Sequence, residues 1–259
     1  MFEAAGLNVS VQSYTDGGEA MNALVAQQAQ VAGGAEPTTI LRMSRAELRP
    51  LAVYVQSGTY IKLAARKGVA TPADIRRIGV VPGTVSEYAT GLMARHLGLD
   101  LAALQVVRSG PPELPALLAR GDVDAYFAWE PWPTLGVRQG GHVLLTSGDV
   151  GYTTNLWINT TAGWLDANRA AAKGIIKVLA HACEVSQQDP KRAAAVQAVT
   201  KIPSAQTLAL VQDTQFGVHD FTDADMAGYD GIADFLADRK ITASRVDYRP
   251  AMQRGFFRA

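Results

Sequence analysis

Residues 117–131 read LLARGDVDAYFAWEP, and this stretch decides the fold class of the chain. It combines the end of a helix, a glycine stop at Gly121, an apolar run from Val123 to Ala128 and a polar turn. A helix that leads directly into a buried strand is typical of α/β proteins. Trp129 and Glu130 then fall at the carboxyl end of the strand, where open parallel sheets bind their ligands. We expect this pair at a binding site; packing at the rim and capping of the next helix are the structural alternatives.

Helical patterns and short apolar runs alternate through the middle of the chain. Three helices are expected: one around residues 89–97, one from Pro111 to Gly121 and one that begins at Pro131. They separate four expected strands, which are Ile78–Val81, Leu104–Val107, Val123–Ala128 and His142–Leu145. This alternation predicts an α/β fold with a doubly wound, mostly parallel sheet.

The first sixty residues repeat this pattern more weakly. We expect a helix over Glu19–Gln28 and strands at Val9–Tyr14, Val31–Gly34 and Leu51–Gln56. Residues 24–37 align without gaps on residues 118–131, so that Glu36 falls on Glu130. The alignment predicts two similar turns at strand ends; chance similarity between two βαβ units is the alternative.

The last third of the chain has a different character. A strand is expected at Asn155–Asn159, followed by a long helical segment that begins at Trp164 and is broken at Asp189-Pro190. Further helices are expected at Arg192–Val199, Ser204–Gln212 and Thr222–Asp238. Because this third has no α/β core of its own, we expect it to pack against the N-terminal sheet.

Composition excludes several kinds of function. The 24 basic and 24 acidic residues balance, and no basic run indicates a nucleic acid or an anionic membrane as partner. The single cysteine, Cys183, permits neither an intrachain disulfide nor a thiolate metal cluster. The four histidines are scattered, so we expect no metal site and no cofactor. No segment reaches the roughly 18 to 20 consecutive apolar residues of a membrane-spanning helix.

Several motifs occur together in an order that a known family shares. They are AGLNV (residues 5–9), TPADI (71–75), IGVVPGTVSEY (78–88), GDVDA (121–125) and WEP (129–131). With the helical last third, they resemble the substrate-binding proteins of ABC importers for sulfonates, taurine and nitrate. The resemblance covers nearly the whole chain, although no single motif is highly specific.

The resemblance implies a two-lobed, type II periplasmic binding protein fold. Lobe I would comprise residues 1–62 and 153–259, and lobe II residues 63–152. The protein would be a monomer without enzymatic activity that binds a small organic anion in the cleft between the lobes and delivers it to a membrane permease. Its expected location is the periplasm, or the cell surface with a lipid anchor.

The resemblance also bears on the start of the chain. Members of the family carry an export signal, a first strand and most of a first helix before the segment that matches Met1. We therefore expect lobe I to lack these elements here, because the start codon is misassigned or the chain is a fragment.

The turn from Pro82 to Glu87 is the best candidate for an anion site. It follows a strand and opens a helix, so free backbone amides and the positive helix end would face a bound anion. The candidate ligand residues are Gly83, Thr84, Val85 and Ser86, and the resemblance places ligand contacts here too. A simple helix cap by Thr84 or Ser86 is the structural alternative.

The remaining candidates lie at other strand ends. Gln56 marks the outgoing crossing between the lobes, and Thr153 and Asn155 mark the return crossing; all three offer polar groups, and all three could be ordinary turn residues. Glu36 and Glu130 would repel a bare anion, so their contact with ligand would indicate a cationic or hydrogen-bond donor group on that ligand.

Two other classes of function stay open. Desulfinases and thiamine-pyrimidine synthases resemble these binding proteins, but their cysteine-bearing signatures are not visible in this sequence. Cys183 lies mid-helix among apolar residues, which indicates an inert thiol, so we expect no catalytic residue. A ligand-sensing regulatory module is the third possibility.

Overall fold

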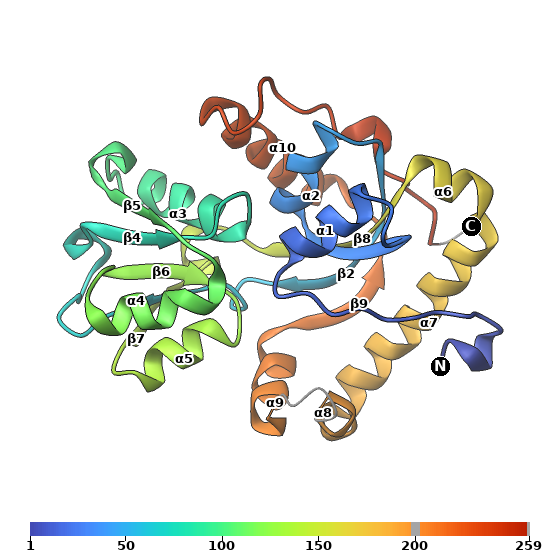
Figure 1. Cartoon of the computed structure of the whole chain (residues 1–259), viewed down its shortest axis with the longest axis horizontal. Coiled ribbons are helices and arrows are strands. Elements are labelled where there is room, and N and C mark those ends of the chain that lie inside the picture. The colour runs from blue at the N-terminus through green and yellow to red at the C-terminus, as the bar shows by residue number, and fades with distance from the viewer. Residues whose placement is uncertain (198–202, 258–259) are drawn as a thin grey trace. The chain divides into compact units, whose positions relative to one another are not determined.

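The computed structural model describes residues 1–197 and 203–257, which form two compact units (Figure 1). Unit 1 comprises residues 1–56 and 155–259, and unit 2 comprises residues 57–154. Each unit is built around one β-sheet. Among the described helices, none combines the length and the apolar composition needed to span a bilayer.

Unit 2 contains a five-stranded mixed sheet in the order β5-β4-β6-β3-β7. The strands are β3 (Lys62–Ala65), β4 (Arg77–Val80), β5 (Gln105–Arg108), β6 (Ala125–Ala128) and β7 (His142–Thr146). The four strands predicted from sequence all run in one direction, because β4 is parallel to β5 and β6, and both β6 and β7 are antiparallel to β3. The β3 strand was not predicted, since its four residues carry no periodic pattern.

The helices of unit 2 cover both faces of this sheet. Figure 1 shows α3 (Val85–His96) on one side, and α4 (Leu114–Arg120) with α5 (Trp132–Arg138) on the other. Gly121 ends α4 with a φ of 78°, a conformation that glycine adopts without strain. Single helical turns complete the unit at η2 (Pro72–Asp74), η3 (Leu101–Ala103), η4 (Pro111–Glu113) and η5 (Gly148–Val150).

The sheet of unit 1 has the order β1-β8-β2-β9. Its strands are β1 (Val31–Ala35), β2 (Leu48–Ser57), β8 (Thr154–Thr161) and β9 (Gln215–His219). The prediction of a mostly parallel sheet is wrong here, because β1 pairs antiparallel with β8 and β2 pairs antiparallel with β9. The direction of a strand in the sheet depends on how the chain returns to the sheet, and β8 and β9 come from segments distant from β1 and β2 in the sequence. The sequence analysis did not predict β9.

The predicted strand at Val9–Tyr14 is also absent. Residues 8–14 have no regular secondary structure, and none of the described strands pairs with them. Val11 is 78% exposed, so the alternation of apolar and polar residues in this segment does not bury its apolar side chains. The residues before it form a single turn, η1 (Glu3–Ala5), that ends at Gly6.

The helices of unit 1 come from both ends of the chain. They are η1, α1 (Gly17–Val25), α2 (Glu36–Met43), α6 (Ala162–Ala167), α7 (Arg169–Gln188), α8 (Pro190–Gln197), α9 (Ser204–Asp213), α10 (Asp223–Asp238) and η7 (Arg249–Ala251). The predicted long helix from Trp164 is divided at Asn168, whose φ of −133° is not helical. The last two residues of the predicted helix Arg192–Val199 lie outside the described ranges.

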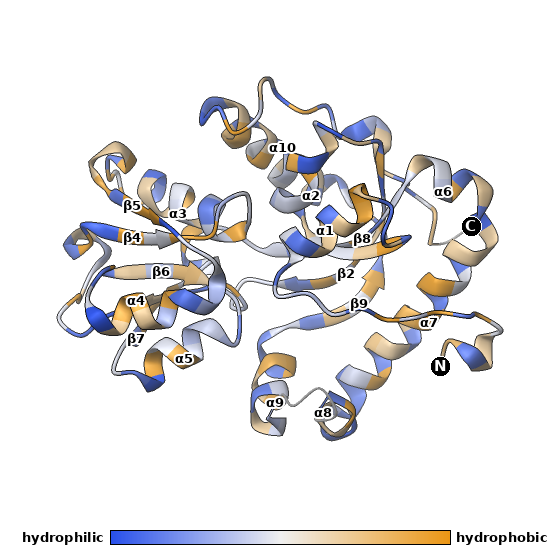
Figure 2. Ribbon diagram, viewed as in Figure 1, coloured by the Kyte–Doolittle hydropathy of each residue, from blue (hydrophilic) through white to orange (hydrophobic). Residues whose placement is uncertain are grey.

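The helical last third packs on the sheet of unit 1, as predicted. Ala172 and Ile176 of α7 pack with Ala52 and Ile158 of the sheet in one apolar cluster. Figure 2 shows that hydrophobic and hydrophilic residues alternate along α7, as expected for a helix with one buried face. On the other side of the sheet, α10 packs against α2.

Candidate functional site

Two of the predicted turns lie together at one edge of the unit 2 sheet. The Gly83–Ser86 turn follows β4, and Trp129-Glu130 follows β6. Because β4 and β6 are neighbouring parallel strands, their carboxyl ends meet at the same sheet edge. Lys62 begins the antiparallel strand β3 at this edge, since it is paired with Ala128.

Hydrogen bonds within the chain hold the Gly83–Ser86 turn in a defined shape. The Thr84 hydroxyl donates to the Val81 carbonyl oxygen at 2.8 Å and accepts from the Ser86 amide at 3.2 Å. The Ser86 hydroxyl accepts from the Val81 amide at 3.0 Å. Both side chains are buried. Thr84 caps α3, which is the structural alternative to ligand binding, whereas the Ser86 hydroxyl binds the strand-end amide of Val81 rather than an amide of the helix. The Ser86 amide is already bound by Thr84, so the donors that an anion could use are the other amides of the first α3 turn, which have no acceptor within the helix.

A carboxylate already lies at this turn. The Gly83 amide donates to Oε2 of Glu87 at 2.8 Å, and Gly83 reaches this geometry with a φ of 67°. Arg108 lies 3.6 Å from the other oxygen of Glu87 and offsets part of its charge. An anion bound at the amino end of α3 would therefore compete with Glu87 for the positive potential there.

The Trp129-Glu130 pair is held by unit 2 itself. Trp129 is partly buried and packs against a core cluster that includes Leu118 and Tyr126. Glu130 Oε1 lies 2.9 Å from the Lys62 ammonium nitrogen, and Oε2 accepts a long bond of 3.4 Å from the Thr134 amide. Lys62 compensates the charge of Glu130, so a ligand near Glu130 does not need a cationic group. The argument from the sequence that Glu130 indicates a cationic ligand group is therefore weaker.

A second group of predicted residues lies at one edge of the unit 1 sheet. Glu36 follows β1 directly and is 1% exposed, and Asn155 near the start of β8 is 4% exposed. The Asn155 amide donates to Oε1 of Glu36 at 2.9 Å. At the end of β2, the side-chain amide of Gln56 donates to Oδ1 of Asp225 at 3.3 Å. Three predicted site residues therefore meet at this edge.

Sequence reasoning missed the residues that surround Glu36. Trp157 donates from its indole nitrogen to the Tyr229 hydroxyl at 3.2 Å. Burial raises the pKa of Tyr229, and the negative charges of Glu36 and Asp225 raise it further. These two carboxylates thus act on the same hydroxyl. The capping motif of Thr222 and Asp225 signalled a helix start, but no local signal placed that helix beside Glu36.

Thr153 is the predicted residue that the structure leaves apart from both groups. It is exposed and belongs to unit 2, whereas Asn155, two residues further along, belongs to unit 1. The binding role of all the predicted site residues stays a prediction.

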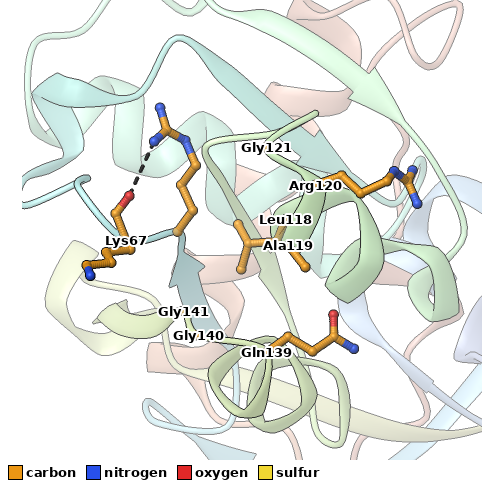
Figure 3. A pocket seen from close by; sticks show the side chains of 9 residues that line it. Lys67, Leu118, Ala119, Arg120, Gly121, Gln139, Gly140 and Gly141 are labelled. Atoms are coloured by element: carbon orange, nitrogen blue, oxygen red, sulfur yellow. Dashed lines mark hydrogen bonds between the residues drawn. The ribbon is translucent and has the colours of Figure 1, made fainter.

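The described surface of unit 2 also contains a cavity of about 220 Å³ (Figure 3). It is lined by Arg66, Lys67, Leu118, Ala119, Arg120, Gly121, Gln139, Gly140 and Gly141. Arg66 follows β3 at the end paired with Ala125, so the cavity lies at the sheet edge opposite the Gly83–Ser86 turn. Arg66 donates to the Lys67 carbonyl oxygen within it (Figure 3). No predicted site residue lines this cavity.

The described residues offer neither a metal site nor a reactive thiol. Over residues 1–197 and 203–257, no cluster of three or more His, Cys, Asp or Glu side chains is arranged to hold a metal ion. Burial raises the pKa of Cys183 to about 11, and its thiol donates to the Tyr54 carbonyl oxygen at 3.7 Å. A thiol with this pKa is almost entirely protonated near neutral pH, which makes it a poor nucleophile.

The two α/β units with polar turns at their strand ends define a protein of the periplasmic binding protein fold. Residues 1–200 match the NMT1-like family, and the chain belongs to this family. The predicted α/β fold of a periplasmic binding protein, apart from the strand directions in unit 1, and the resemblance to sulfonate- and taurine-binding proteins are thereby confirmed.

Individual relatives are distant in sequence. The taurine-binding periplasmic protein of Escherichia coli (strain K12) is 23% identical over 161 residues, which are 60% of this chain and 50% of that protein. The chain thus spans about half the length of the curated relative it matches. The alkanesulfonate-binding protein of Xanthomonas axonopodis pv. citri, solved with bound MOPS, is 18% identical with a TM-score of 0.83, covering 95% of this chain and 88% of that one. The desulfurization enzyme DSZB is 16% identical with a TM-score of 0.69, covering 99% of this chain and 91% of that one.

Proposed function

We propose that this protein is the solute-binding component of an ABC import system and that it binds a small organic anion without chemical change. The observation that carries the proposal is the fold likeness, over 95% of the chain, to a protein that binds alkanesulfonates. The proposed ligand class comprises sulfonates, taurine and nitrate, and the taurine-binding relative supports taurine within it. The partner would be a membrane permease, and the place of action the periplasm or the outer face of the membrane.

The geometry of unit 2 supports an anion site at the amino end of α3. The turn before this helix is rigid, because Thr84 and Ser86 bind both the carbonyl and the amide of Val81. The amides of the first α3 turn other than that of Ser86 lie at the positive end of the helix, and such amides are suited to a sulfonate or nitrate group. In this arrangement the hydroxyls position the amides, and the amides bind the ligand.

The ligand class is tested by isothermal titration calorimetry of the chain with ethanesulfonate, taurine, nitrate and acetate. Saturable binding of at least one sulfonate or of nitrate is expected, together with a rise in melting temperature. Replacing Thr84 and Ser86 together by alanine should weaken that binding, whereas Thr90→Ala, which removes a buried hydroxyl one turn further along α3, should not. If no anion of the panel binds the folded protein, the proposal is wrong.

A desulfinase is the second candidate, favoured by the likeness to the desulfurization enzyme DSZB. The buried Cys183 thiol with its raised pKa does not suit nucleophilic attack on a sulfinate. Incubation with aromatic and alkyl sulfinates, followed by a colorimetric sulfite assay, separates the two candidates. Release of sulfite above the rate without protein would favour the enzyme, and its absence together with anion binding would favour transport.

A further inference from the structure

The cavity of unit 2 lies where three turns of the chain meet. Arg66 and Lys67 follow the end of β3, Gly121 follows α4, and Gly140 lies just beyond the end of α5. A methyl group on Gly121 or Gly140 would meet no atom within 4 Å, so the space beside these turns is open. A volume of about 220 Å³ is below the roughly 300–1,000 Å³ of pockets for drug-sized ligands, which indicates a small ligand or the head of a larger one.

The cationic side chains of the cavity differ in what they already bind. Arg66 donates from Nε to Oδ1 of Asp124 at 2.9 Å and from Nη1 to the Lys67 carbonyl oxygen at 3.3 Å (Figure 3). These bonds fix the guanidinium and leave Nη2 without an acceptor among the described residues. The Lys67 side chain is exposed and forms no ion pair with any residue that the structure describes. Arg120, in contrast, pairs with Asp122 at 2.8 Å.

The charge around the cavity is positive. The described residues that line it include three basic side chains and no carboxylate. The carboxylates that pair with the lining are Asp122 and Asp124, and Asp124 is shared with Arg77. Four cations are therefore set against two carboxylates. The carboxyl ends of α4 and α5 add at most about half a unit of negative charge each, which does not cancel the excess.

A phosphate group is the ligand group that this charge favours. Guanidinium and ammonium groups both donate charge-assisted hydrogen bonds to phosphate oxygens. A phosphate monoester carries a charge of about −1.5 to −2 near pH 7. A sulfonate carries a single negative charge, so it gains less from an excess of more than one positive charge.

We propose that this cavity binds a phosphate group, either as inorganic phosphate or as the monoester head of a phospholipid. Nη2 of Arg66 and the ammonium group of Lys67 donate to the phosphate oxygens, and the side-chain amide of Gln139 adds a neutral donor. The cavity lies at the sheet edge opposite the Gly83–Ser86 turn. A phosphate bound there therefore does not compete with an anion bound at the amino end of α3.

Nuclear magnetic resonance of the ¹⁵N-labelled chain, titrated with inorganic phosphate at low ionic strength, tests the location. Saturable shifts of the backbone amides of Gly121, Gly140 and Gly141 are expected, and they should persist with saturating ethanesulfonate. Lys67→Gln should weaken phosphate binding about three- to tenfold, because one charge-assisted bond from an exposed side chain is lost. Gln139→Glu should weaken it as well, because it adds a negative charge to the lining.

Arg95→Gln is the matched control. Arg95 is exposed near the end of α3, which covers the other face of the sheet, and its replacement removes the same unit of charge outside the cavity (Figure 1). Phosphate affinity should stay as in the wild type. Equal weakening by Lys67→Gln and Arg95→Gln, or shifts confined to the amides of the Gly83–Ser86 turn, would overturn the proposal. Sulfonate affinity should be unchanged in the Lys67 variant, so this result is independent of the proposed function.

Sedimentation with lipid vesicles distinguishes the two sources of the phosphate group. Binding to phosphatidylcholine vesicles that contain phosphatidate, but not to vesicles of phosphatidylcholine alone, would identify a lipid head if Lys67→Gln reduces it. Binding of inorganic phosphate without vesicle binding would identify the free anion. If neither inorganic phosphate nor phosphatidate binds, the proposal is wrong.

Discussion

Asp124 carries a prediction that can be worked out in full from the structure. Its carboxylate is 2% exposed and accepts four hydrogen bonds. Oδ2 accepts from the backbone amides of Arg76 and Arg77 at 2.9 and 2.8 Å. Oδ1 accepts from the side chains of Arg66 and Arg77 at 2.9 and 3.2 Å. These contacts attach the residue before β6 to the start of β4 and to Arg66, the residue that follows β3.

The pKa of Asp124 gives the size of the effect. Burial alone would raise this pKa, but the two amides and the Arg66 guanidinium lower it from 3.8 to about 2. Each unit of difference corresponds to about 1.4 kcal/mol, so the ionised carboxylate contributes about 2–3 kcal/mol to the free energy of unfolding. Because the folded-state pKa is lowered, this contribution is fully present above about pH 4 and is lost as the pH falls toward 2.

Asp124→Asn keeps the shape of the side chain and removes its charge. We expect a loss of about 2–3 kcal/mol or more at pH 7, because the amide NH₂ group also faces donors that it cannot pair with. Urea denaturation followed by tryptophan fluorescence at pH 7 and at pH 2.5 measures the loss. The difference between wild type and variant should shrink strongly at the lower pH, because Asp124 is then mostly protonated in the unfolded chain and folding must remove that proton.

Asp122→Asn is the control, because Asp122 is half-exposed and pairs only with Arg120 among its described contacts. Exposed ion pairs contribute about 0–1 kcal/mol. If the two variants lose equal stability at pH 7, or if the Asp124→Asn difference is independent of pH, the argument from burial and hydrogen bonding is refuted.

Three further predictions concern the sheet edge of unit 2. Ser86→Ala removes the acceptor of a buried strand-end amide and should lower stability by about 1–3 kcal/mol in urea denaturation; an unchanged midpoint would contradict the role given to this hydroxyl. Glu87→Gln removes the carboxylate that competes at the amino end of α3, so calorimetry at low ionic strength should show about two- to fivefold tighter anion binding, and unchanged affinity would mean that no anion binds there. Lys62→Met leaves Glu130 nearly buried without its cation and should cost about 3 kcal/mol in thermal or urea unfolding; adding Glu130→Gln should recover part of this loss, and a double variant no more stable than the single one would argue against the pairing.

Much of the candidate site could be predicted because its signals are local. A glycine after an apolar run, followed by hydroxyl residues and an acid, predicted the turn at Gly83 and the helix that starts after it. The alignment of Glu36 with Glu130 predicted two carboxylates next to strand ends, and both follow strands in the structure. The surroundings of these carboxylates could not be predicted, because Lys62 lies 68 residues from Glu130 in the sequence.

The same division holds for the fold. The strands β4 to β7, between residues 77 and 146, were predicted because each has an apolar run bounded by turn residues. The β3 strand was missed because four residues are too few for a period to show. The segment at Val9–Tyr14 has the alternation of a strand, but a strand forms only where a neighbour offers its backbone groups, and no described strand does so.

The sequence by itself determined where most helices and strands begin and end, which turns carry polar groups, and that the chain resembles sulfonate- and taurine-binding proteins. These properties depend on caps, glycines and periods that lie within a few residues of one another. Only the tertiary structure decided that the sheet of unit 1 pairs antiparallel, that Lys62 compensates Glu130, and that Asn155 holds an unpaired oxygen beside Glu36. The physical reason is that strand pairing and charge compensation join residues far apart in the chain, and no local pattern records which distant residue will meet which.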